Sequence, residues 1–126
     1  MATVTGTQVG ERFLDALEAQ DFDAAAELFA PDGRLRALVP QALRDDEGPD
    51  AVANRFRFWW DGLAELELLE REAARFHDRT RIRYRWRGRD PEDGWVEVEQ
   101  EGYLRLDADG RIAVMNVVCS GFVAVA

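Results

Sequence analysis

Residues 80–106 read TRIRYRWRGRDPEDGWVEVEQEGYLRL, and the alternation of side chains in this stretch decides the fold. Arginine occupies every second position from Arg81 to Arg87, and apolar or aromatic residues stand between: Ile82, Tyr84 and Trp86. A period of two is typical of a strand with one buried and one solvated face. The turn signals in 88–94 lead into a second strand over 95–106, so the sequence predicts a long hairpin.

The second strand of this hairpin carries a row of glutamates at Glu97, Glu99 and Glu101. Antiparallel pairing would place this row against the arginine row as cross-strand ion pairs. We therefore expect a charged ladder that faces water or a partner subunit rather than nucleic acid.

Further strands are predicted on both sides of the hairpin. A strand over 64–76 precedes it, and the turn 107–110 leads into a last strand from 111 to about 123. This last strand is apolar on both faces, with Ile112, Val114, Val118 and Phe122 expected on the outer one. A strand buried on both sides predicts a homodimer through the outer face of the sheet.

The first 60 residues are predicted to hold three helices. The first spans 8–19, the second is capped by Asp21, and the third starts at Gly48-Pro49 and is capped by Gly62. A short strand over 34–39 and a polar loop over 41–50 are expected between the second and third helices. Helices followed by a meander of strands indicate an α+β fold.

Composition narrows the classes of partner. The chain has 126 residues, 47% of them hydrophobic, which suits one domain over 1–126. Its net charge of −9 argues against nucleic acid and anionic membranes. One cysteine and one histidine predict no metal site, and we expect no cofactor. The N-terminus lacks the features of a signal peptide, which predicts a cytoplasmic protein.

The segments 12–33, 48–56 and 99–122 resemble the NTF2-like (cystatin-like) superfamily in motif and in order. They are similar to its SnoaL-like and ketosteroid isomerase-like branches. This resemblance implies a cone in which three N-terminal helices pack on a curved antiparallel sheet. The fold hosts isomerases, cyclases, dehydratases, epoxide hydrolases and non-catalytic binders, so it does not by itself fix a function.

The resemblance also implies what is missing. The oxyanion tyrosine, the aspartate base and the second oxyanion aspartate of ketosteroid isomerases fall on Phe13, Ala37 and Gly102. None of these residues carries the required group. The resemblance therefore implies that this chain does not isomerise steroids by that mechanism.

Gln100 is the only strongly polar residue on the inward face of its predicted strand, next to Tyr84 and Trp86. A buried amide needs partners, so Gln100 either orients a ligand or satisfies a Tyr84 hydroxyl or a backbone group. Aromatic residues at strand spacing either line a pocket or simply fill a core. The remaining residues that we expect on the pocket wall are Phe13, Ala37, Phe56, Trp59, Trp60, Gly102, Met115 and Cys119.

Two further choices stay open in this candidate pocket. Only one of Trp59 and Trp60 can face fully inward, and Cys119 is interpreted as a small buried hydrophobe. Glu70 and Glu72 are the candidate catalytic residues, because a carboxylate held in an apolar pocket can carry protons. Ion pairing with nearby arginines at the surface is the alternative for both.

Three functions are compatible with these patterns. The first is binding of a small apolar molecule in the cone, with Gln100 and Tyr84 as polar anchors. The second is acid/base catalysis of the SnoaL-like kind through Glu70 or Glu72, as an isomerase, cyclase, dehydratase or epoxide hydrolase. The third is a dimeric scaffold with a filled interior. A cavity of about 300 Å³ or more beside Gln100 would favour the first two.

Overall fold

The computed structural model describes residues 4–125, which form three helices and seven strands. In chain order they are α1 (Gly6–Glu18), α2 (Phe22–Glu27), β1 (Phe29–Val39), β2 (Ala42–Glu47), α3 (Pro49–Trp60), β3 (Ala64–Phe76), β4 (Arg79–Asp90), β5 (Gly94–Leu106), β6 (Ile112–Cys119) and β7 (Val123–Ala124). No helix within this range is long and apolar enough to cross a membrane.

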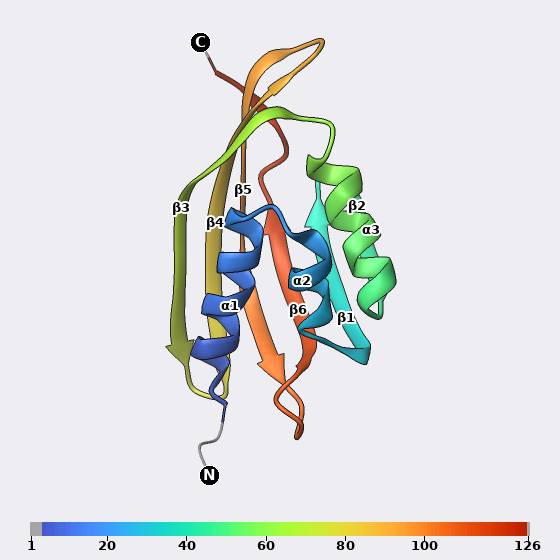
Figure 1. Cartoon of the computed structure of the whole chain (residues 1–126), viewed down its shortest axis with the longest axis vertical. Helices are drawn as coiled ribbons and strands as arrows, with labels where there is room; N and C mark the ends of the chain where they lie inside the picture. Colours follow the sequence, from blue (N-terminus) through green and yellow to red (C-terminus); the bar gives the residue numbers. More distant parts are fainter. Residues whose placement is uncertain (1–3, 126) are drawn as a thin grey trace.

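The strands form one sheet in the order β2-β1-β6-β5-β4-β3, and β7 pairs with β5. The helices lie together on one face of this sheet (Figure 1). The meander from β3 to β6 is antiparallel as predicted, but β1 and β6 run parallel. The expectation of an all-antiparallel sheet is therefore wrong at one pair, because the chain crosses from one edge to the other through α3.

The predicted polar loop over 41–50 is instead strand β2, which pairs with β1. Its register places acidic residues beside arginines, so that Arg34 contacts Asp45 and Glu47, each at 3.0 Å. These contacts between exposed side chains of the edge strand β2 and its neighbour β1 cannot be read from local hydrophobicity. As a consequence the third helix follows a hairpin, and the three helices are not consecutive.

Local signals account for most helix ends. Thr5 and Gln8 form a capping box at the start of α1, and Asp21 caps α2 through the Ala24 amide. Gly48 precedes Pro49 at the start of α3, as predicted. The expectation for Gly62 is wrong, because α3 ends at Trp60 with Asp61 as its cap residue, and Gly62 does not adopt the left-handed conformation of a capping glycine.

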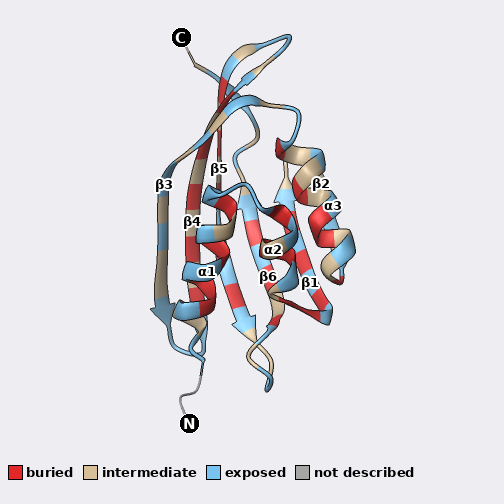
Figure 2. Cartoon of the chain, viewed as in Figure 1, coloured by how far each residue is buried: buried red, intermediate tan, exposed pale blue. Residues whose placement is uncertain are grey.

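The predicted register of the charged ladder is confirmed, and the ladder extends over three strands. The register pairs Arg83 with Glu101, Arg85 with Glu99 and Arg87 with Glu97. Among the glutamates of this row on β5, the ion pairs found in the described chain are those of Glu99 with Arg83 and Arg85, both at 3.8 Å. Figure 2 shows buried residues alternating with intermediate or exposed residues along these strands. This outer face is charged, so the opposite face supplies the core.

The core is rich in aromatic residues from helices and sheet alike. The Trp60 ring stacks on Phe56, with ring centroids 5.3 Å apart. It also packs against Tyr84 and Trp86, at 6.0 and 5.4 Å. Trp60 therefore joins the end of α3 to the inner face of β4.

Candidate functional site

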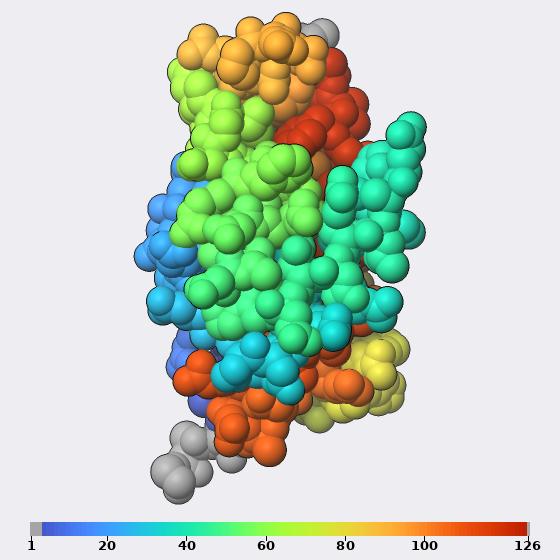
Figure 3. All heavy atoms as spheres, turned by 90° about the vertical axis from the view of Figure 1, so that its right-hand side faces the viewer, coloured from blue at the N-terminus to red at the C-terminus, as the bar shows by residue number. Residues whose placement is uncertain are grey.

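An apolar cavity of about 220 Å³ lies where three elements end: α3, β1 and β6. Figure 3 shows this side of the molecule, with the chain end in red between α3 in green and the β1–β2 hairpin. The cavity is lined by Val39, Pro40, Trp59, Trp60, Val98, Gln100, Cys119, Gly121 and Phe122. Within the described chain, this lining includes no acidic residue, arginine or histidine.

The segment after β6 closes one side of the cavity because of a glycine. Gly121 has a φ of 76°, a left-handed conformation that other residues rarely adopt. A Cβ at this position would lie only 2.7 Å from Cγ of Pro40. Ser120 holds the turn against β5, since its Oγ accepts the Glu99 N–H at 2.9 Å. The turn thus brings Phe122 to the cavity wall.

Gln100 supplies the polar group of the cavity, and it is only 1% exposed. Its Oε1 accepts a hydrogen bond from the Tyr84 hydroxyl at 2.5 Å. Burial raises the pKa of the Tyr84 phenol well above its usual range, so this hydroxyl keeps its proton and donates. The Gln100 Nε2 group finds no acceptor among residues 4–125. The expectation that Gln100 satisfies the Tyr84 hydroxyl is therefore confirmed, and its Nε2 group is left without a partner in the described chain.

Two other buried nitrogens, Trp86 Nε1 and Arg87 Nε, also lack partners in the described chain. Neither residue lines the cavity. Gln100 is therefore the residue that combines an unpartnered donor with a place on the cavity wall.

Both tryptophans at the end of α3 line the cavity, although they differ in burial. Trp60 is 1% exposed, whereas Trp59 is half-buried. Their ring centroids are 5.6 Å apart. Trp60 is therefore the inward residue of the pair, and Trp59 forms the outer rim.

Cys119 lies on the cavity wall where it was expected, and it is half-buried rather than buried. It pairs with Gln100 across β5 and β6. The Gly121 N–H donates to its Sγ at 3.4 Å. The turn that brings Phe122 to the wall thus also fixes the sulfur beside the amide.

The deeper interior is filled rather than hollow. Six of the predicted wall residues are buried in the core and do not line the cavity: Phe13, Ala37, Phe56, Tyr84, Trp86 and Met115. Phe13, for example, packs edge-on against Phe56 at 5.8 Å. The prediction that Tyr84 is a polar anchor on the cavity wall is therefore wrong. At about 220 Å³ the cavity is smaller than the roughly 300 Å³ that would favour binding or catalysis, so its volume alone favours the filled interior of a scaffold.

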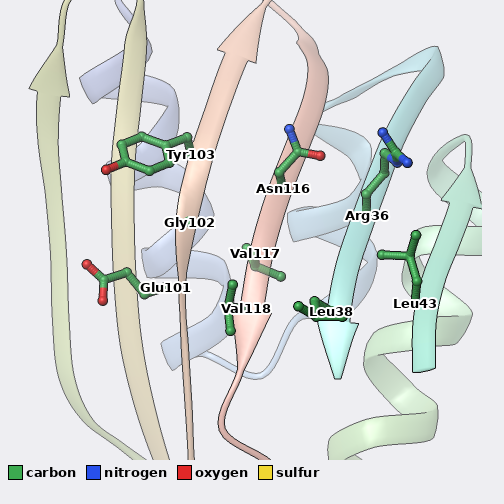
Figure 4. A pocket seen from close by; sticks show the side chains of 9 residues that line it. All are labelled: Arg36, Leu38, Leu43, Glu101, Gly102, Tyr103, Asn116, Val117 and Val118. Carbon is green, nitrogen blue, oxygen red and sulfur yellow. The ribbon is translucent and has the colours of Figure 1, made fainter. Parts of the chain in front are cut away.

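Gly102 lies elsewhere, at the floor of a groove on the outer face of the sheet. The groove has a volume of about 490 Å³ and crosses β5, β6, β1 and β2 (Figure 4). Its lining residues are Arg36, Leu38, Leu43, Glu101, Gly102, Tyr103, Asn116, Val117 and Val118. The predicted place of Gly102 on the inner pocket wall is therefore wrong.

Outward residues of β6 differ in part from the prediction. Val118 faces the groove as expected, and Asn116 stands beside it. Ile112 is buried instead, because an irregularity in the pairing of β5 with β6 turns the strand at that point. The outer face of β6 is thus a mixed surface rather than an apolar one.

Glu70 and Glu72 point away from the cavity. Both are exposed on β3, where Glu70 contacts Arg85 at 3.2 Å and Glu72 pairs with Arg81. The hypothesis that one of them serves as an inward proton carrier is therefore wrong. They extend the charged ladder instead.

Sequence reasoning missed Pro40 and Gly121 as cavity residues, and its placement of Phe122 on the outer face of the last strand is wrong, because Phe122 lines the cavity. The only local signal was Gly121, which interrupts an otherwise strand-like run after Cys119. The direction of the chain after this glycine depends on the packing against Pro40, which no local pattern encodes.

Comparison with known proteins agrees with this geometry. The model of the SnoaL-like domain family matches residues 10–115. The chain belongs to the SnoaL-like domain family. This SnoaL-like domain therefore falls within the NTF2-like superfamily, as its sequence motifs indicated. No curated protein matches it in sequence.

Several solved structures share the fold of this SnoaL-like domain. An NTF2-like protein from Burkholderia thailandensis superposes with a TM-score of 0.78 at 19% identity, covering 94% of this chain and 92% of that chain. A candidate SnoaL-like polyketide cyclase from Shewanella putrefaciens gives 0.69 at 14% identity, with 90% and 88% covered.

A ketosteroid isomerase-like protein from Catenulispora acidiphila, solved with trimethylamine, also superposes on this SnoaL-like domain. Its TM-score is 0.70 at 16% identity, with 90% of this chain and 85% of that chain covered. At these identities the structural matches show the fold alone.

Proposed function

We propose that this SnoaL-like domain binds a small, neutral and mostly apolar molecule that carries a hydrogen-bond acceptor. The observation that supports this proposal is the Gln100 Nε2 group, which is buried on an apolar cavity wall without an acceptor among residues 4–125. Leaving such a donor unpaired costs about 1–3 kcal/mol. A ligand oxygen placed against Nε2 would recover that cost.

The size of the cavity limits the ligand. An engineered apolar cavity of about 150 Å³ accepts benzene. A cavity of about 220 Å³ therefore has room for one ring with a short substituent. The uncharged lining disfavours an ionic ligand, because nothing on the wall would compensate its lost hydration. An aryl ketone such as propiophenone meets both conditions.

Ligand choice should depend on Gln100. We expect propiophenone to bind more tightly than butylbenzene, which has a similar length but no acceptor. Gln100→Leu should weaken propiophenone binding about 3- to 10-fold, corresponding to one hydrogen bond, and should leave butylbenzene binding unchanged or improved. Isothermal titration calorimetry at 25 °C measures both affinities.

Tyr84→Phe serves as the matched control for this experiment. It removes the hydroxyl that binds Oε1 but keeps the Nε2 donor, so the preference for the ketone should persist. If the wild-type chain binds neither compound at millimolar concentration, and its melting temperature does not respond to them, the dimeric scaffold is the better account.

The catalytic alternative through Glu70 or Glu72 has lost its support, because both carboxylates are exposed and paired with arginines. No other carboxylate in the described chain lines the cavity. Binding therefore remains the function that the site supports best.

We also propose that the outer groove pairs with a second copy of this chain. Leu38, Leu43 and Val118 are each more than half exposed along it, which is unusual for large apolar side chains. The adjoining charged ladder has a row of arginines beside a row of glutamates. In a symmetric dimer the positive row of one copy could lie against the negative row of the other.

Val118→Glu tests this pairing. We expect the wild-type chain to sediment as a dimer at micromolar concentration, and the variant to weaken association by about tenfold or more, because a buried unpaired charge is costly. Val123→Glu is the matched control, since Val123 is 55% exposed, close to the 59% of Val118, but lies outside the groove. If the wild-type chain sediments as a monomer at micromolar concentration, the proposed pairing is wrong.

A further inference from the structure

Cys119 and Gln100 place a thiol and a free amide donor on one wall of the same cavity. They are direct partners in the antiparallel pairing of β5 with β6. Side chains on one face at such positions have Cβ atoms about 4.5–5.5 Å apart. Both residues line the same partly open cavity.

The sulfur is accessible and held in place. Cys119 is half-buried, with no disulfide partner, and its Sγ accepts the Gly121 N–H at 3.4 Å. The aromatic rings of Trp59, Trp60 and Phe122 line the same cavity. A planar molecule seated there would lie beside the two neighbouring residues that carry the sulfur and the buried, unpartnered Nε2.

We propose that Cys119 is a covalent acceptor for small aryl α,β-unsaturated carbonyl compounds, with Gln100 Nε2 binding their carbonyl oxygen. This inference rests on the proposed ligand-binding function. It adds a reaction to that function and narrows the ligand to electrophiles of one class.

The reaction is a conjugate addition that needs no oxidant or metal. The thiol gives its proton to water, and the sulfur forms a bond to the β-carbon of the ligand. The carbon–carbon π bond breaks, and its electron pair shifts toward the carbonyl oxygen to give an enolate. The Gln100 N–H stabilises this oxygen as its negative charge develops. The α-carbon then takes a proton from water, which leaves a thioether and a saturated ketone.

The composition of the chain makes the reaction easy to follow. Cys119 is the single cysteine, and the chain has one histidine and no lysine. Intact-mass measurement with phenyl vinyl ketone should therefore give one adduct per chain, located at Cys119 by peptide mapping and absent in Cys119→Ser. At low reagent concentration the reaction should be about tenfold faster than that of N-acetylcysteine at the same pH, and its rate should saturate as the cavity fills.

A second reagent isolates the role of the amide. Benzyl bromide alkylates a thiol and carries no oxygen, so Gln100→Leu should leave its rate within about twofold. The same substitution should slow phenyl vinyl ketone about tenfold, because the developing oxyanion loses its donor. A rate that is linear in concentration, no faster than N-acetylcysteine and insensitive to Gln100→Leu would overturn the inference.

Propiophenone, the saturated analogue, separates this inference from the binding proposal. If Cys119→Ser binds propiophenone while the wild-type chain reacts slowly with the enone, ligand binding stands and the covalent step is wrong. If propiophenone does not bind, the reversible site itself is wrong, and the covalent inference falls with it.

Discussion

Trp60→Ala is expected to destabilise the fold by about 3–5 kcal/mol, the usual cost of truncating a buried tryptophan. The Trp60 side chain is fully enclosed, stacks on Phe56 and packs against Tyr84 and Trp86. Its removal would leave a hole between the end of α3 and the inner face of β4, and the rings around it are too rigid to close it. Equilibrium unfolding in urea at 25 °C measures the loss.

Phe58→Ala is the matched control on the same helix. The Phe58 side chain is 75% exposed, so its truncation should change the free energy of unfolding by no more than about 0.5 kcal/mol. A cost below about 1 kcal/mol for Trp60→Ala would mean that the rings around it rearrange, and that the cavity is shaped by ligand rather than by the packed core.

Trp60→Ala also bears on function, because Trp60 separates the cavity from the packed interior. The variant should gain volume next to Gln100 and accept a two-ring ketone that the wild-type cavity of about 220 Å³ excludes. If the variant binds the larger ketone and is also less stable, the Trp60 ring determines both the size of ligand that the cavity accepts and the stability of the fold.

The strands from β3 to β6 could be predicted from the sequence because their two faces differ in chemistry. Arginine and glutamate rows occupy one face and apolar residues the other, so the register and the ladder follow from a period of two. The short strand β2 carries no such contrast. Its sequence, ALRDDE, becomes a strand through contacts of Asp45 and Glu47 with Arg34 on β1.

The candidate site was predictable in part for a similar reason. Gln100 is conspicuous as the polar residue on an inward apolar face, and its link to Tyr84 follows from the predicted pairing. The volume of the cavity was not predictable, because it depends on how Phe13, Phe56 and Trp86 pack around Trp60. The aromatic residues that were predicted to line a pocket instead occupy most of the space inside the cone.

Gly102→Ala is expected to cost about 3 kcal/mol, at the upper end of the usual range for overpacking. A Cβ at Gly102 would lie 1.8 Å from the Asn116 carbonyl oxygen and 2.6 Å from Cα of Val117. Both neighbours are backbone atoms of β6, so no side-chain rotation can relieve the contact. The variant should lower the midpoint of urea unfolding, and Gly62→Ala should not, since no atom lies within 4 Å of a Cβ at Gly62.

The outcome at Gly102 also decides how to interpret the missing oxyanion aspartate. By resemblance, the second oxyanion donor of ketosteroid isomerases falls on this position. If even one methyl group is destabilising here, an aspartate cannot be accommodated, and the close approach of β5 to β6 excludes that chemistry by geometry. If Gly102→Ala is as stable as Gly62→Ala, the strands can separate, and the acid is missing only because the sequence does not supply it.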